Sequence, residues 1–127
     1  SDIIHSSAGM EAINFLCNNN IENIYVIGRK SIEYSSFTPK ELRETVQNSR
    51  IAIFHNIPSS SNGKLASIIK SGRRITGSNV CVNFLFDFVP EHAVSIDGKI
   101  IGMLFKETRH SQMSLDTFKF FPADLII

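Results

Sequence analysis

The chain has 127 residues, 43% of them hydrophobic and 20% charged, which is the balance of one globular domain with its own core. Its formal net charge is +1, so no overall basic field favours duplex DNA or an anionic membrane as a partner. These numbers exclude a disordered tail and a repeat array, and no apolar run reaches the roughly 18 residues of a membrane span.

The cysteines and histidines carry no metal signature. Cys17 and Cys81 lie far apart without a CxxC pair, which favours two small core residues in a reducing compartment. The histidines fall in separate segments with no paired spacing. We therefore predict neither a disulfide nor a metal ion; the four histidines are His5, His55, His92 and His110.

Helix and strand patterns alternate through the first half of the chain. Apolar residues at helical spacing predict a helix over 6–19, directly after Ser1 to Ile3 and with no strand before it. The β-branched and aromatic run 23–27 predicts a buried parallel strand. The stretch Thr38-Pro39-Lys40-Glu41 is a capping box with proline at the first helical position, and it predicts a helix to about residue 48. A strand at 51–54, a loop at 58–63 and a helix at 64–71 follow.

The second half of the chain has the alternation of β-strands. Residues 80–89 predict one strand with Phe84, Phe86 and Phe88 in the core, because no cations are interleaved for nucleic-acid stacking. Asp97-Gly98 predicts a hairpin between 93–96 and 99–107. A polar connection at 109–117 and a buried strand at 120–127 follow. The order predicts the α/β class, as a Rossmann-like three-layer domain with an inserted antiparallel β-hairpin or meander.

The residues after the 23–27 strand are the first candidate site, because α/β sheets bind ligands at the carboxyl ends of their strands. They read Gly28-Arg29-Lys30-Ser31. A carboxylate at this position accepts hydrogen bonds from a free ribose 2′-hydroxyl, whereas basic residues accommodate a 2′-phosphate. Arg29 offers a planar fork, Lys30 a point charge and Ser31 a hydroxyl, which favours NADP over NAD. A solvated loop with no ligand is the alternative.

A longer pattern surrounds these residues. The stretch from Ile24 to Lys30, followed by Phe37-Thr38 and by Lys40-Glu41-Leu42-Arg43-Glu44, resembles the NADP-binding domain of adrenodoxin reductase-type ferredoxin-NADP reductases. In that family a strand ends in Gly-Arg-Arg-Gly, and a Phe-Thr-x-Lys-Glu-Leu-Arg-Glu helix start follows at the same spacing. The likeness extends more weakly to the hairpin and to the closing Ala-Asp-Leu-Ile-Ile. Lys30 and Ser31 depart from the family's second arginine and second glycine.

The resemblance implies an FAD flavoprotein that transfers electrons between NADPH and ferredoxin or adrenodoxin, located in the mitochondrion of a eukaryote. It implies that Arg29 and Lys30 hold the 2′-phosphate of NADP(H) and that Glu41 is the acidic residue of the nucleotide site. Glu41 also has a complete structural explanation in the capping box. No residue is assigned a catalytic role.

The family's NADP domain opens with a strand and a GxGxxA turn, and the sequence shows no turn of that form. We therefore expect residues 1–127 to be a single partial NADP-binding domain without its first strand, its glycine-rich turn and the FAD domain, and inactive alone. Two alternatives remain open: a non-enzymatic, degenerate nucleotide-binding-like interaction module, and the NADPH-binding domain of a related flavoprotein with a different acceptor.

Overall fold

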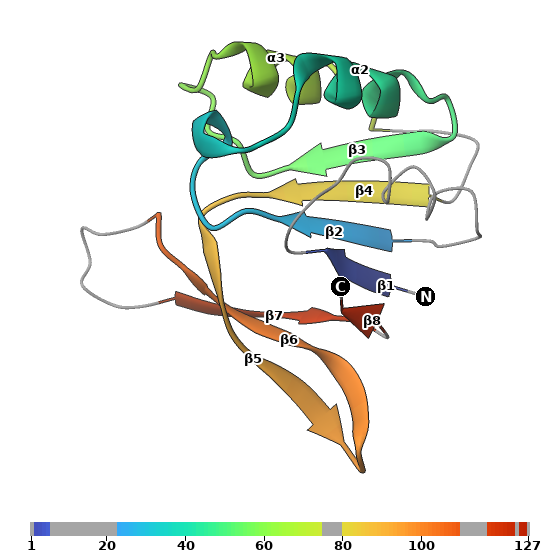
Figure 1. The fold of residues 1–127 in the computed structure, drawn as a ribbon, viewed down its shortest axis with the longest axis vertical. Coiled ribbons are helices and arrows are strands. Elements are labelled where there is room, and N and C mark those ends of the chain that lie inside the picture. Colours follow the sequence, from blue (N-terminus) through green and yellow to red (C-terminus); the bar gives the residue numbers. More distant parts are fainter. Residues whose placement is uncertain (1, 6–22, 75–79, 110–116, 124, 127) are drawn as a thin grey trace.

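A parallel sheet and an antiparallel sheet organise the molecule. The computed structural model describes residues 2–5, 23–74, 80–109, 117–123 and 125–126 (Figure 1). The parallel sheet has the order β3-β4-β2-β1-β8, and the antiparallel sheet has the order β5-β6-β7. The parallel strands are β1 (Asp2–His5), β2 (Asn23–Ile27), β3 (Ile51–His55), β4 (Val80–Leu85) and β8 (Leu125–Ile126). This arrangement confirms the predicted α/β class with a meander inserted before the last strand.

A strand at the start of the chain corrects one expectation. Residues Asp2–His5 form β1, which pairs in parallel with β2 on one side and with β8 on the other. The expectation that no strand precedes residues 6–19 is therefore wrong. The sequence pattern for this strand is weak because the strand has only four residues, and because Ser1-Asp2 also fits the cap of a helix. The helix predicted over 6–19 lies outside the described residues.

Two helices cover one face of the parallel sheet. The predicted capping box is formed at α2 (Pro39–Gln47): the Glu41 backbone N–H donates to Thr38 Oγ1 at 3.2 Å, and the Thr38 N–H donates to Glu41 Oε1 at 3.2 Å. The helix predicted over 64–71 is α3 (Lys64–Lys70). A short 3-10 turn, η1 (Ile32–Tyr34), joins β2 to α2.

The strand predicted over 80–89 is in fact two strands. β4 ends at Leu85 and β5 (Phe88–Ile96) begins in the other sheet, with Asp87 between them at φ 66°. A left-handed residue cannot continue a strand, so the chain turns here. The predicted burial of Phe84, Phe86 and Phe88 is confirmed, since each is at most 2% exposed.

The meander begins with the predicted hairpin. Asp97 and Gly98 both have positive φ, as a two-residue turn of the primed type requires, and they connect β5 to β6 (Lys99–Glu107). β7 (Thr117–Pro122) then pairs with β6. The prediction of one buried strand over 120–127 is wrong: Phe120 is 44% exposed and belongs to the antiparallel sheet, while only β8 joins the parallel sheet.

Two apolar clusters hold the layers together. The larger lies between the helices and the parallel sheet and includes Ile24, Leu42 and Phe84. The smaller joins the antiparallel sheet to the strand ends through Ile27, Phe88, Phe105 and Ala123. Both clusters contain a residue of β2, so the loop that follows this strand starts from a position fixed on two sides.

Candidate functional site

A cavity of about 400 Å³ lies at the carboxyl end of β2. In Figure 1 the carboxyl ends of β2, β3 and β4 meet at this edge of the sheet. The cavity has apolar walls and a polar rim, and none of its lining residues is acidic. The residues that line it are Val26, Ile27, Gly28, Arg29, Lys30, Ser31, Tyr34, Ser35, Ser36, Phe37 and Phe86.

Residues 28–31, which we call the basic loop, have a backbone that is fixed by hydrogen bonds to the junction between β4 and β5. Gly28 N donates to Leu85 O at 2.8 Å, and Phe88 N donates to Gly28 O at 3.1 Å. Asp87 N donates to Lys30 O at 3.2 Å. A Cβ on Gly28 would lie 2.9 Å from the Phe86 ring, so only glycine allows the loop to pass this close.

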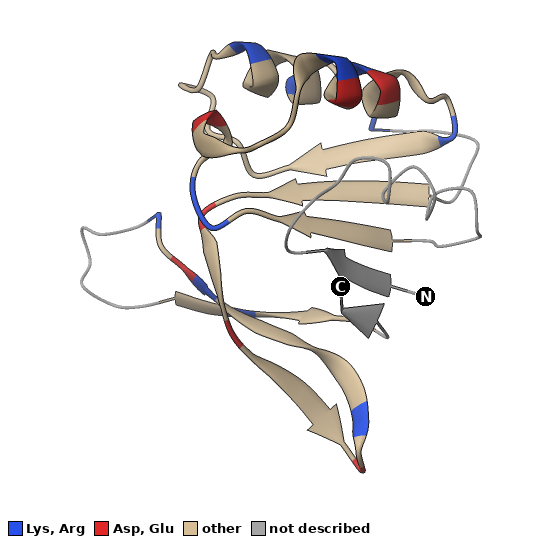
Figure 2. Cartoon of the chain, viewed as in Figure 1, with Lys and Arg blue, Asp and Glu red and all other residues tan. Residues whose placement is uncertain are grey.

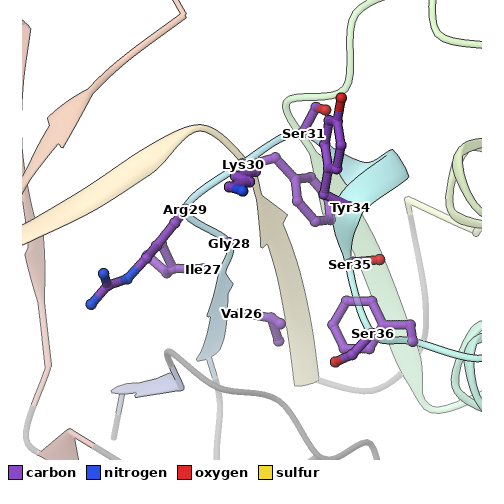
Figure 3. Close-up of a pocket in the computed structure, with 11 residues that line it drawn as sticks. Val26, Ile27, Gly28, Arg29, Lys30, Ser31, Tyr34, Ser35 and Ser36 are labelled. Carbon is purple, nitrogen blue, oxygen red and sulfur yellow. The ribbon is translucent and has the colours of Figure 1, made fainter.

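Arg29 and Lys30 both project from this fixed backbone into solvent, and both line the cavity. Figure 2 shows Lys and Arg in the loop between β2 and η1. The two side chains diverge in Figure 3: Lys30 lies beside Tyr34, with Nζ 5.5 Å from the ring centroid, and Arg29 extends away from that ring. The structure therefore brings the two predicted cations to one cavity, at separate parts of its rim.

Glu33, in the turn that follows the basic residues, has a pKa below its ordinary value. The Ser31 hydroxyl is the main cause, followed by the backbone N–H of Glu33, and Ser61 adds to the effect. Ser31 also lines the cavity.

Glu41 does not reach the cavity. It lies in the first turn of α2, and its carboxylate accepts hydrogen bonds from the backbone and the hydroxyl of Thr38, the latter at 2.7 Å. It is not among the residues that line the cavity. The structure thus places two of the three predicted site residues together and gives the third a role in helix capping.

Three residues that the sequence patterns did not single out hold this edge of the sheet together. The Arg109 guanidinium contacts Asp87 Oδ2 through Nη2 at 3.0 Å and through Nε at 3.2 Å. Arg109 also donates to the backbone oxygen of Asn56. The Asn56 side chain bonds both backbone groups of Phe86, at 2.8 and 2.9 Å. Since these contacts join segments far apart in the sequence, no local pattern marks them.

His55 ends β3 beside this edge. Its Nδ1 accepts the backbone N–H of Ile57 at 3.0 Å, and its Nε2 lies 3.3 Å from Arg74 Nη2. Partial burial, together with the positive charges of Arg74 and Lys70, lowers the pKa of His55. These surroundings therefore favour the neutral form of the imidazole in the folded state.

We expect the stability of the protein to fall in acid through His55. Because the folded-state pKa lies below the unfolded one, the unfolded chain binds more protons once the pH drops below about 6.5. The free energy of unfolding should decrease from there until the folded-state pKa is passed. Urea unfolding between pH 7.5 and pH 5 measures this, and His55→Asn, which keeps an acceptor near Ile57, should flatten the slope. The exposed His92, changed to asparagine, is the control; an equal flattening in His92→Asn would contradict the assignment.

Within the described residues, no group of three or more His, Cys, Asp or Glu side chains is placed to hold a metal ion. No helix in this part of the chain is both long and apolar enough to cross a membrane.

No protein-family model and no curated protein matches the chain. Among solved structures, FprA, an oxidoreductase of Mycobacterium tuberculosis, is similar at a TM-score of 0.68 and 12% identity over 98% of this chain. FprA in complex with NADPH matches at 0.69 and 12%, and a point mutant of FprA at 0.67 and 13%. The chain spans 37% of the length of these neighbours. At this identity the likeness establishes the fold, which is a Rossmann-like α/β domain.

Proposed function

We propose that this chain is the NADP(H)-binding part of an FAD flavoprotein that transfers electrons between NADPH and ferredoxin or adrenodoxin. The observation that carries the proposal is the pair of exposed cations, Arg29 and Lys30, at the rim of a cavity where the second strand of a Rossmann-like sheet ends. The NADPH complex of the structural neighbour FprA supports the same ligand. The proposal also includes ferredoxin or adrenodoxin as the electron acceptor and a mitochondrial location for the protein.

The lining of the cavity fits the adenosine end of NADP(H). Two cations and no carboxylate surround its rim, which suits a 2′-phosphate and leaves a free 2′-hydroxyl without an acidic acceptor. Apolar walls from Val26 and Phe86 suit the flat face of a base. The cavity is also large enough for a nucleotide-sized group.

NADPH supplies a hydride to the flavin when both are bound, and the residues of this chain contribute binding and orientation. Arg29 presents two parallel N–H donors to phosphate oxygens, and Lys30 presents a compact charge from the other part of the rim. Because the loop backbone is hydrogen-bonded to residues 85–88, the backbone positions from which these two side chains extend are fixed relative to the sheet. Such preorganisation lowers the entropic cost of fixing the ligand.

In this class of fold the pyrophosphate-binding turn follows the first strand. The residues after β1 read Ser6-Ser7-Ala8-Gly9, with one glycine instead of the glycine-rich form, and they lie outside the described part of the chain. The absence of a glycine-rich turn from this chain, and an FAD domain elsewhere in the parent protein, stay predictions drawn from the family resemblance.

The proposed phosphate contacts predict a change in donor preference. In the intact reductase, NADPH should be preferred over NADH, and Arg29→Ala or Lys30→Ala should each remove about 1.5–3 kcal/mol of that preference, the range for hydrogen bonds to charged groups. Arg29→Lys should lose less, because it keeps the charge without the fork. The kcat/KM ratio for the two donors measures the effect.

Two further variants serve as controls. Arg50→Ala removes an exposed cation that does not line the cavity and should leave the preference unchanged. Glu41→Gln keeps the capping-box geometry while removing a charge, so it tests the nucleotide role that the resemblance implies for Glu41 separately from helix stability. Equal use of NADPH and NADH by the unmutated protein would refute the 2′-phosphate assignment.

A further inference from the structure

Tyr34 is a large aromatic side chain exposed beside the basic loop. The residue is 74% exposed, more than any other large hydrophobic residue in the described part of the chain. Single exposed apolar residues are common, but this one lies in the wall of the candidate cavity. Figure 3 shows its ring standing out from η1, next to Lys30.

The turn that carries Tyr34 is well anchored. The Tyr34 N–H donates to Ser31 O at 3.1 Å, and the Ser35 N–H donates to Ile32 O at 3.0 Å. Ile32, in the same turn, is 2% exposed and belongs to the larger apolar cluster. The ring therefore extends from a fixed backbone. When a ligand binds, only the side-chain torsions of Tyr34 have to become ordered.

The charge beside the ring defines which ligand fits it. Lys30 Nζ lies over the Tyr34 ring, 5.5 Å from its centroid, so the ammonium group covers one face of the ring. A planar base can stack on the opposite face while a phosphate on its ribose reaches past the ring edge to the ammonium group. Stacking of a base on an aromatic side chain is worth about 1–3 kcal/mol.

We propose that Tyr34 is the stacking platform for the adenine base of the bound nucleotide, with Lys30 on the opposite face of the ring and in contact with the 2′-phosphate. This inference rests on the proposed function and adds a residue to its site. Tyr34 then contributes affinity for the base, whereas Arg29 and Lys30 contribute selectivity for the phosphate. Neither the capping-box pattern nor the basic motif identifies it.

Intrinsic tyrosine fluorescence tests the proposal directly. The chain has two tyrosines and no tryptophan, and Tyr25 packs against Phe121 with the ring centroids 5.4 Å apart. Titration of the protein with adenosine 2′,5′-bisphosphate should quench the emission of Tyr34 with a saturable curve. Tyr34→Phe should abolish that quenching while binding, measured by calorimetry, stays within about threefold, because the ring is kept. Tyr34→Ala should weaken binding by about 5–150-fold.

Two controls separate this inference from the proposed function. Inorganic phosphate, which lacks a base, should bind Tyr34→Ala and the unmutated protein equally. If Tyr34→Ala binds adenosine 2′,5′-bisphosphate as tightly as the unmutated protein while Lys30→Ala does not, the stacking role is refuted and the phosphate site stands. If adenosine 5′-monophosphate quenches Tyr34 as well as the bisphosphate does, stacking is supported and the 2′-phosphate assignment fails. If the unmutated protein binds neither nucleotide, both proposals fall.

Discussion

Replacing Phe105 with alanine should lower the free energy of unfolding by about 3–5 kcal/mol, the usual cost of removing a fully buried aromatic ring. Phe105 is 0% exposed and packs edge-on against Phe88 and Phe121, with centroids 6.4 and 5.5 Å away. These rings form the cluster that joins the antiparallel sheet to Ile27, the last residue of β2. Chemical denaturation followed by circular dichroism measures the loss.

Phe118 provides a matched control for Phe105. It is the same residue type in the neighbouring strand, but it is 51% exposed, so Phe118→Ala should change stability by no more than about 0.5 kcal/mol. Because Ile27 also lines the candidate cavity, Phe105→Ala should weaken nucleotide binding even where the protein stays folded. Equal stability losses in the two variants would show that the cluster does not hold the sheets together.

A single methyl group at Gly102 should also destabilise the protein, by about 1–3 kcal/mol, which is the cost of overpacking. A Cβ there would lie 2.4 Å from the backbone oxygen of Phe121 and 2.4 Å from the Phe120 ring. Since Gly102 pairs across to Pro122 in β7, the clash should push this strand away from β6. Thermal unfolding of Gly102→Ala reports the loss, and hydrogen exchange in β7 should rise with it.

A double variant separates the two clashes at Gly102. Phe120→Leu removes the ring contact and leaves the backbone contact in place, so Gly102→Ala combined with Phe120→Leu should recover part of the stability and not all of it. Full recovery of stability would mean that the backbone of β7 can move to avoid the methyl group. No recovery would mean that the Phe120 ring does not clash with the methyl group. Phe120→Leu alone is the reference, because that ring is 44% exposed.

The elements that the sequence predicted correctly are those whose signals are local. The Thr38 to Glu41 capping box and the Asp97-Gly98 turn each contain their own hydrogen-bonding or torsional requirement within a few residues. The pattern that predicted the basic loop after Ile27 is also contained within a few residues. Such patterns hold in the folded structure because tertiary contacts add to them without opposing them.

The features that sequence analysis missed depend on contacts between distant segments. The left-handed Asp87 is held by Arg109, and nothing near residue 87 in the sequence requires the strand to end there. Strand β1 is too short to have a clear period, and it is fixed by pairing with β2 and β8. Tyr34 is a different case: it lies only four residues after Lys30, and its place beside this side chain depends on the 3-10 turn η1, which no sequence pattern predicted.

The pairing of β1 with β8 has a kinetic consequence. Ile3 pairs with Leu125 and Ile4 with Ile126, so this part of the parallel sheet joins opposite ends of the sequence. Such a pair raises the contact order, and closing a loop of nearly the whole chain carries a large entropic cost that local hairpins avoid. We expect β5 and β6 to form early and the β1-β8 ladder to form last, so that a folding intermediate would expose the free edge of β1 to other chains.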